Sequence, residues 1–252
     1  ETVGYISKII PRTNYIIRKS PNLSKESHII AANIDQAFLI VTIQFPVTTT
    51  TFIDRFLVSA EAYRIPCHLI FNKTDLYNNE QTEVMNSWIE IYENIGYRCL
   101  KLSAKNNTGF EELKSMMANK TNVFSGHSGV GKSTIINILH PAGKLKTGEI
   151  SDAHSSGKHT TTNSEMYEFE FGGYIIDTPG IKGFGVLEME KEEISHYFPE
   201  IFKLLDGCQY YNCTHTHEPN CIVKKSVEEG KIAMSRYNSY LGLLDGEEKY
   251  RN

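Results

Sequence analysis

One eight-residue segment has the residue types and spacing of a phosphate-binding loop. Residues 126–133 read GHSGVGKS and match the pattern G-x-x-x-x-G-K-S. Glycines in this pattern allow the backbone amides and the start of the next helix to face phosphate oxygens. The pattern places the ammonium of Lys132 at the β- and γ-phosphates and the hydroxyl of Ser133 at Mg²⁺. The segment predicts a nucleoside triphosphate site formed by Gly126, His127, Ser128, Gly129, Val130, Gly131, Lys132, Ser133 and Thr134.

A second segment carries groups that distinguish purine bases. Asn72-Lys73-Thr74-Asp75 follows an apolar run, and the carboxylate of Asp75 can accept hydrogen bonds from N1-H and the exocyclic amine of guanine. Adenine offers no donors at these positions, and a site built to hydrogen-bond one base rejects another by about 10⁴ or more. Ser103-Ala104-Lys105 follows the next apolar run, where its backbone would contact the guanine carbonyl oxygen. The two segments favour GTP over ATP.

A third segment contains groups that sense the γ-phosphate. Asp177-Thr178-Pro179-Gly180 follows an apolar run, and we expect Asp177 to hold Mg²⁺ through water and the Gly180 amide to contact the γ-phosphate. The next residue is Ile181, where many GTPases carry a glutamine that orients the attacking water, so intrinsic hydrolysis should be slow. The water could be positioned instead by His159, by His127 or by a group from a partner.

The order of these segments is unusual for a GTPase. In ordinary GTPases the phosphate loop comes first, whereas here the guanine segment at residues 72–75 precedes the phosphate loop at residues 126–133. The sequence therefore predicts a circularly permuted site, with all parts present in rotated order. Because of the permutation, the segment after Asp177 continues into a different C-terminal region.

Three of the five cysteines cluster near the C-terminus. Cys208, Cys213, His215 and Cys221 follow the spacing C-x₄-C-x-H-x₅-C, which indicates metal ligands rather than a disulfide framework. Three thiolates and one imidazole complete a tetrahedral set, so we expect one structural Zn²⁺ with no open position for catalysis. His217 is an alternative ligand to His215.

Apolar runs alternate with helical patterns, which predicts an α/β fold with a parallel sheet. The expected strands cover residues 37–43, 67–71, 98–102 and 122–124. The expected helices cover residues 52–63, 82–94, 110–118 and 132–139. Residues 166–171 and 174–176 predict a β-hairpin around Gly172-Gly173, before which residues 144–164 form a long polar stretch.

The two ends of the chain differ from this central part. Alternating stretches at residues 2–10 and 15–18 indicate a hairpin fragment, too short for a complete barrel of the oligonucleotide-binding (OB) type. Beyond Leu187 the composition shifts to charged helical segments and the cysteine cluster. We expect a remnant of an OB-fold at residues 1–32, a permuted P-loop GTPase domain at residues 33–187 and a helical zinc domain at residues 188–252.

Charge and hydropathy narrow the classes of partner. The 252 residues carry a formal net charge of −4 with a pI near 6.2, so any RNA contact must come from local patches. Lys224-Lys225, Lys231 and Arg236-Tyr237 form one basic segment, which could meet rRNA phosphates or be a solvated helical face. The sequence has no apolar run of about 18 residues and no signal segment, so we expect a cytoplasmic protein outside membranes.

In these segments the chain resembles the circularly permuted GTPases known as RsgA or YjeQ, which depend on the small ribosomal subunit. The segments that carry the resemblance span nearly the whole chain. Besides the nucleotide and cysteine segments, they are Pro11-Arg12-Thr13-Asn14, Asn33-Ile34-Asp35-Gln36, Asp54-Arg55, Gly157-Lys158-His159-Thr160-Thr161-Thr162, Phe198-Pro199-Glu200 and Arg236-Tyr237. Two features depart from the family pattern: we expect a barrel that is only partly present in this sequence, and Lys158 stands where an arginine is common.

The resemblance implies an N-terminal OB barrel, a central GTPase and a C-terminal zinc domain. It implies late maturation of the small (30S) subunit, contact with its 16S rRNA, and hydrolysis of GTP to GDP and phosphate that the subunit stimulates. One threonine of residues 160–162 would close on Mg²⁺ and the γ-phosphate; the sequence leaves open which one, and Thr161 is the candidate named below. The expected catalytic residues are thus Lys132, Thr161 and His159, in a protein that acts as a monomer. The alternative function is a GTP-dependent rRNA-binding module in which turnover is incidental.

Overall fold

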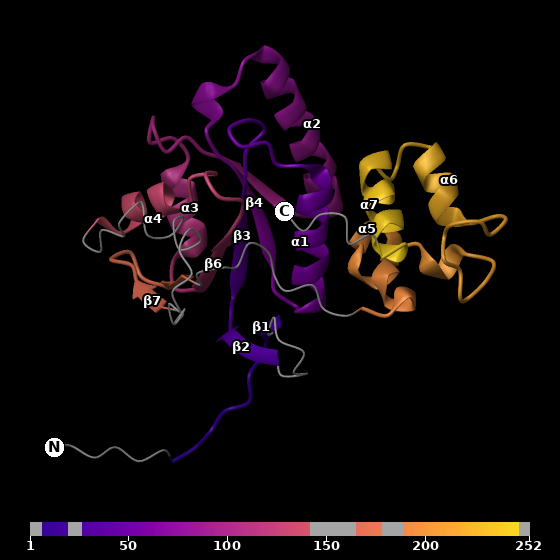
Figure 1. Ribbon diagram of the computed structural model, residues 1–252, viewed down its shortest axis with the longest axis horizontal. Helices are drawn as coiled ribbons and strands as arrows, with labels where there is room; N and C mark the ends of the chain where they lie inside the picture. Colours follow the sequence, from indigo (N-terminus) through magenta and orange to yellow (C-terminus); the bar gives the residue numbers. More distant parts are fainter. Residues whose placement is uncertain (1–6, 20–26, 142–164, 178–188, 247–252) are drawn as a thin grey trace, which may run out of the picture.

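In a computed structural model, a six-stranded sheet forms the centre of the protein (Figure 1). The structure describes residues 7–19, 27–141, 165–177 and 189–246. The strand order is β5-β4-β3-β6-β8-β7, and all neighbours run parallel except β7 and β8. The strands are β3 (Gln36–Val41), β4 (Cys67–Phe71), β5 (Arg98–Lys101), β6 (Thr121–Ser125), β7 (Glu165–Glu168) and β8 (Tyr174–Asp177). The predicted parallel sheet and its antiparallel hairpin are confirmed.

The strands follow the apolar runs because the central strands are covered on both faces. Every residue of β3 is buried, as expected for a parallel strand between two helical layers. The strand ends at Val41, two residues before the predicted end, because Thr42 begins a closed loop. The Thr42 hydroxyl donates to the carbonyl of Pro46 at 2.6 Å, and the Thr48 amide donates to the carbonyl of Thr42 at 2.9 Å.

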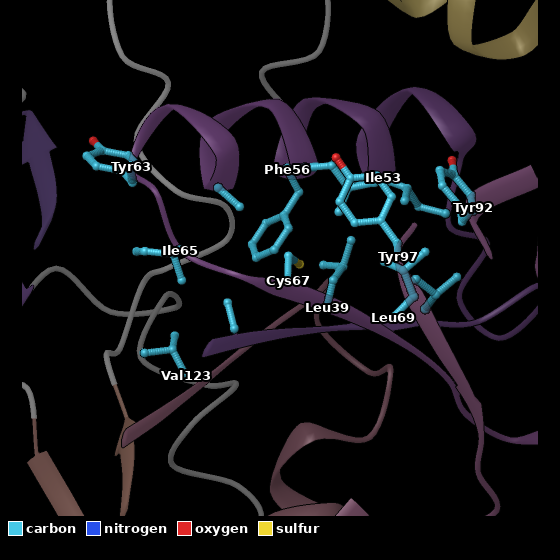
Figure 2. Close-up of a cluster of buried hydrophobic side chains, with 14 of the residues drawn as sticks. Leu39, Ile53, Phe56, Tyr63, Ile65, Cys67, Leu69, Tyr92, Tyr97 and Val123 are labelled. Atoms are coloured by element: carbon cyan, nitrogen blue, oxygen red, sulfur yellow. The ribbon is translucent and has the colours of Figure 1, made fainter. Parts of the chain in front are cut away.

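Helices cover both faces of the sheet (Figure 1). Helices α1 (Thr50–Ala62) and α2 (Asn79–Ile95) pack on one face, and α3 (Phe110–Met117) and α4 (Lys132–Leu139) pack on the other. Figure 2 shows Ile53 and Phe56 of α1 above Leu39 and Leu69 of the sheet, in a cluster that is almost entirely buried. These layers hold the strand ends, and thus the loops that follow them, in fixed positions.

Helix α2 begins earlier than its apolar pattern because polar residues cap it. The Asn78 side chain accepts from the Gln81 amide at 2.8 Å, and the Gln81 side chain accepts from the Asn78 amide at 3.1 Å. This capping box satisfies backbone donors of the first turn, which is too polar to follow the helical period. Gly96 ends the helix with φ +117°.

The N-terminal strands pair differently from the prediction. Strand β1 (Tyr15–Lys19) is antiparallel to β2 (Ser27–Ala32), whereas the described residues 7–14 form no strand. The predicted pairing with residues 15–18 is therefore wrong for residues 7–10; residues 1–6 lie outside the described part. The reason is Asn14, whose side chain accepts from the Ile34 amide and donates to its carbonyl, both at 2.8 Å. These bonds join the start of β1 to the segment after β2.

A third layer of short helices lies beside α1 (Figure 1). It consists of the 3-10 helices η3 (Lys191–Tyr197) and η4 (Leu205–Gly207) with α5 (Pro199–Phe202), α6 (Ile222–Glu228) and α7 (Met234–Leu244). These elements share a separate buried cluster that also includes Val58 of α1. Among the described residues, no helix has the length and apolar character needed to cross a membrane.

Candidate functional site

The phosphate loop lies between β6 and α4 and has room only for glycine at two positions. Gly126 has φ +143°, and a Cβ there would lie 2.5 Å from the carbonyl oxygen of Ile40. Gly131 has φ +104°, and a Cβ there would lie 2.4 Å from Nδ2 of Asn72. Both conformations are ones that residues with side chains rarely adopt. The spacing of the glycines therefore follows from backbone geometry, as the sequence predicted.

Lys132 lies in the first turn of α4 and contacts the loop directly. Its ammonium donates to the carbonyls of Gly126 at 2.6 Å and His127 at 2.7 Å. Ser133 and Thr134 follow it in the same turn, and Thr134 is exposed. A cation and a hydroxyl therefore stand at the N-terminus of a helix, where backbone amides favour negative charge.

The guanine segment contacts the phosphate loop through two side chains. Nδ2 of Asn72 donates to the carbonyl of Val130 at 2.8 Å, and the ammonium of Lys73 donates to the carbonyl of Gly129 at 2.7 Å. Oδ1 of Asn72 is buried and has no protein partner among the described residues. A buried acceptor without a partner is suited to a ligand. Segments more than 50 positions apart thus form one site.

Asp75 is held by Ser103, from the segment Ser103-Ala104-Lys105. The hydroxyl of Ser103 donates to Oδ1 of Asp75 at 2.6 Å and accepts from the Asn106 amide at 3.1 Å. Ser103 is buried, Asp75 and Ala104 are half-buried, and Lys105 is exposed. The bond from Ser103 leaves the second carboxylate oxygen of Asp75 available and fixes its orientation, as a base-reading carboxylate requires.

The γ-phosphate segment lies only partly within the described residues. Asp177 is the last residue of β8, which lies next to β6 and runs parallel to it. Since the carboxyl ends of parallel strands meet at one edge, the end of β8 lies beside the phosphate loop. The predicted residues His159, Thr161 and Gly180 lie outside the described residues, as does Ile181.

His127 of the phosphate loop is stacked on α1. Its ring centroid lies 3.8 Å from that of Phe52, with an interplanar angle of 29°. This contact joins the phosphate loop to the first turn of α1 and restrains the rotation of the imidazole. A role for His127 in positioning water stays a prediction.

The four predicted metal ligands lie together. The ligand atoms of Cys208, Cys213, His215 and Cys221 are all within 4.8 Å of one another. Nδ1 of His215 lies 3.6 Å from Sγ of Cys208 and 3.4 Å from Sγ of Cys221. A tetrahedral zinc ion separates its ligand atoms by about 3.3–3.8 Å. The cluster is therefore compatible with a zinc site that His215 would join through Nδ1.

The alternative ligand His217 lies outside the cluster of cysteines and His215. Its side chain is exposed, and its Nδ1 lies 2.9 Å from the hydroxyl of Thr216. His217 is not part of the cluster, so the competing assignment is wrong.

Two kinds of contact hold the cysteine loop in place. The carboxylate of Glu218 accepts from the amides of Thr214 and Thr216 at 2.7 and 3.0 Å, and from the Thr214 hydroxyl at 2.6 Å. Burial alone would raise the pKa of Glu218, but these hydrogen bonds lower it to about 2. Two hydroxyls of α7 also donate to loop carbonyls: Tyr237 to His215 at 2.6 Å and Tyr240 to Thr214 at 2.8 Å. The ligand loop is thus ordered by protein contacts on both sides.

Comparisons with known proteins agree with this geometry. The family model "RsgA GTPase" matches residues 9–187, more than half of the chain. The chain belongs to the RsgA GTPase family. It is 56% identical over 253 residues to "Small ribosomal subunit biogenesis GTPase RsgA 2" of Bacteroides thetaiotaomicron, a match that covers all of this chain and 82% of the relative.

Two solved structures extend the match to the fold. YjeQ from Thermotoga maritima is 37% identical with a TM-score of 0.77, covering 95% of this chain and 77% of that one. YloQ, described as a circularly permuted GTPase, is 28% identical with a TM-score of 0.72, covering 95% and 82% respectively. This member of the RsgA family is therefore a GTP-hydrolysing enzyme with the permuted α/β fold predicted from the order of its motifs.

In this RsgA-family chain, Arg236 does not belong to an exposed basic segment. The sequence interpretation that placed it there is wrong. The Arg236 side chain is fully buried and donates to Asp54 at 2.8 Å and to Glu200 at 2.6 Å. Arg236 is therefore available neither to rRNA phosphates nor to solvent. Lys225 and Lys231 of the same segment are exposed.

Asp54 carries a sequence signal for a buried charged residue. It follows Ile53 on a helix whose buried face also includes the apolar residues Phe56, Leu57 and Val58. A carboxylate on the buried face of an amphipathic helix needs a charged or hydrogen-bonding partner. The pattern could have predicted a buried cation elsewhere in the chain, although not which one.

Proposed function

We propose that this GTPase acts in late assembly of the small (30S) ribosomal subunit, and that the subunit stimulates its hydrolysis of GTP to GDP and phosphate. The observation that carries the proposal is the joined site, in which Asn72 and Lys73 bond to Val130 and Gly129 of the phosphate loop. The relatives' printed name, small ribosomal subunit biogenesis GTPase, supports the choice of partner.

Each side chain has a proposed role in binding GTP. Asp75 accepts hydrogen bonds from guanine N1-H and the exocyclic amine, Ser103 orients that carboxylate, and the backbone of Ala104 and Lys105 contacts the guanine carbonyl. Lys132 neutralises the β- and γ-phosphates. Oxygen donors suit Mg²⁺, so Ser133 and Asp177 would hold it, and Mg²⁺ would offset phosphate charge. The proposed contacts to the γ-phosphate and the attacking water are made by Gly180, Thr161 and His159.

The C-terminal cysteine cluster is proposed to hold one structural Zn²⁺ through Cys208, Cys213, His215 and Cys221. The donor set suits the ion, because it combines three thiols and one imidazole whose ligand atoms lie within 4.8 Å of one another. The ion would stabilise the short helices around it. We propose no catalytic step for it, because four protein ligands complete its coordination.

The remaining proposals concern organisation and partners. We propose that residues 1–32 belong to an OB-fold, residues 33–187 form the GTPase domain and residues 188–252 form the zinc domain. The two-stranded sheet of β1 and β2 and the separate C-terminal cluster support these divisions. The protein would act as a monomer in the cytoplasm, where its partner and the 16S rRNA are found.

The test is the GTP hydrolysis rate with and without purified ribosomal subunits. Small subunits should raise the rate by orders of magnitude, while large subunits should not. Because Ile181 stands at the usual glutamine position, a GTP-dependent rRNA-binding module with incidental turnover is the second candidate. A hydrolysis rate that is equal with small subunits, with large subunits and without subunits would favour that module. His159→Ala should lose the stimulated rate while keeping GTP affinity.

A further inference from the structure

Tyr77 contacts the guanine segment although it lies outside the four-residue motif. Its hydroxyl donates to the carbonyl of Asn72 and accepts from the amide of Ile43 at 3.0 Å. One phenol therefore links the main chain of the base-reading segment to the loop that follows β3. Burial raises the pKa of Tyr77, so the hydroxyl remains a donor.

The same loop contacts the guanine segment at a second point. The ammonium of Lys73 donates to the carbonyl of Phe45, in addition to its bond to Gly129. The loop itself is closed by the bonds of Thr42 to Pro46 and Thr48. It is thus a rigid support that touches the guanine segment through Tyr77 on one side and Lys73 on the other.

Displacement of the Asn72 backbone would move the base-reading groups. Asn72 and Asp75 are joined by a tight turn, in which the Leu76 amide donates to the carbonyl of Lys73 at 3.0 Å. The Thr74 amide and hydroxyl both donate to the carbonyl of Leu102, at 3.2 and 3.1 Å. The residue that follows β5 therefore fixes this turn at Thr74, and Tyr77 fixes it at Asn72.

We propose that Tyr77 is a positioning residue for guanine recognition, acting through the backbone of Asn72 and the loop after β3. The proposal rests on the proposed role of Asp75 in reading the base. It predicts that loss of a single hydroxyl outside the motif reduces the selectivity for guanine, and not only the stability of the fold.

Tyr97 provides a matched control for stability. Its hydroxyl donates to Oε1 of Glu61 at 3.0 Å, and its ring lies in the cluster beneath α1 (Figure 2). Tyr97→Phe and Tyr77→Phe each remove one hydroxyl from the same α/β unit. Only Tyr77 contacts the guanine segment.

The experiment compares Tyr77→Phe, Tyr97→Phe and Asp75→Asn with the unmodified protein. Affinities for GDP and IDP are measured by titration, because IDP lacks the exocyclic amine assigned to Asp75. Tyr77→Phe should weaken GDP binding by about tenfold, which corresponds to one or two hydrogen bonds. It should also reduce the ratio of GDP to IDP affinity several-fold. Tyr97→Phe, compared at the same thermal stability as Tyr77→Phe, should change neither the GDP affinity nor this ratio.

The outcomes separate the two proposals. If Asp75→Asn lowers the GDP-to-IDP ratio but Tyr77→Phe leaves it within twofold, the role of Tyr77 is refuted and the proposed site stands. Equal losses of GDP affinity in Tyr77→Phe and Tyr97→Phe would also refute it, because stability alone would then explain them. If Asp75→Asn keeps the full ratio, the proposed base-reading site is itself wrong.

Discussion

The guanidinium of Arg236 on α7 donates a hydrogen bond to Asp54 on α1 across 2.8 Å, although the two residues are 182 positions apart and both side chains are fully buried. Glu200 accepts from the same guanidinium at 2.6 Å, and Tyr92 donates to Asp54 at 2.8 Å. The guanidinium carbon also lies 4.6 Å from the ring centre of Phe198. This network fixes the C-terminal helices against α1 of the GTPase core.

Arg236→Leu should lower the free energy of unfolding by about 3–5 kcal/mol, because it leaves Asp54 buried without its cation. The matched control is Arg98→Leu, which breaks an ion pair with Glu112 whose side chains are 55% and 54% exposed. That change should lower the unfolding free energy by less than about 1 kcal/mol. Urea titrations measure both values, and equal losses would contradict the importance assigned to the buried network.

The sequence predicted the parts of the fold that depend on local pattern. Fully buried strands appear as continuous apolar runs, so β3 and β4 were located within two residues. It could not predict the partner of Arg236, because ion pairs between distant segments leave no periodic signal. The N-terminal pairing failed for a similar reason: the bonds between Asn14 and Ile34 decide it, not the alternation of apolar residues.

The candidate site was predictable where short motifs fix the chemistry. The four metal ligands were identified by spacing, and the structure brings their donor atoms together. The support for the guanine segment was not predictable, since Tyr77 and Phe45 belong to no motif and contact Ile43 and Lys73, respectively, only after folding.

Gly131→Ala should strongly weaken nucleotide binding. The new Cβ would lie 2.4 Å from Nδ2 of Asn72 and would displace this amide, which donates to the carbonyl of Val130 in the phosphate loop. Gly96→Ala is the control, because Gly96 also has positive φ but has no atom within 4 Å of a new Cβ. GDP affinity, measured by titration, should fall by more than about 100-fold in Gly131→Ala, from strain and clash together. Similar GDP affinities in the two variants would contradict the proposed contact.

Cys213→Ser should remove the zinc ion and disorder the helices around it. Structural zinc contributes folding free energy directly, and the small core of this region depends on it. Metal analysis should find one zinc per chain in the unmodified protein and none in the variant, with a loss of helical circular dichroism. Cys99→Ser, at a free cysteine outside the cluster, should keep the ion. Retained zinc in Cys213→Ser would contradict the assignment.

His68 should make stability fall as the pH falls below neutrality. Burial lowers its pKa to about 4 from an ordinary value of 6.5, with further lowering by Lys120 and Arg98. Between these two pH values the unfolded chain binds a proton that the folded protein does not, so the free energy of unfolding decreases from pH 6.5 towards 4. The loss should level off below about pH 4.

The control for this prediction is His68→Gln, which keeps a donor near Oε1 of Gln36, an atom 3.3 Å from the imidazole. Urea unfolding at pH 7 and pH 5 should show a smaller decrease for the variant than for the unmodified protein. An equal decrease in both proteins would assign the pH dependence to other groups.

The central claim is that segments in permuted order bind the same guanine nucleotide. In Asp75→Asn an amide donor replaces a carboxylate acceptor, which suits the carbonyl that xanthine carries in place of the guanine amine. The most direct measurement is therefore the affinity for XDP and GDP of Asp75→Asn, with and without Lys132→Ala. Asp75→Asn should prefer XDP, and the added Lys132→Ala should remove most of that XDP binding. XDP binding that does not change when Lys132 is replaced would show that the two segments serve separate ligands and would contradict the account.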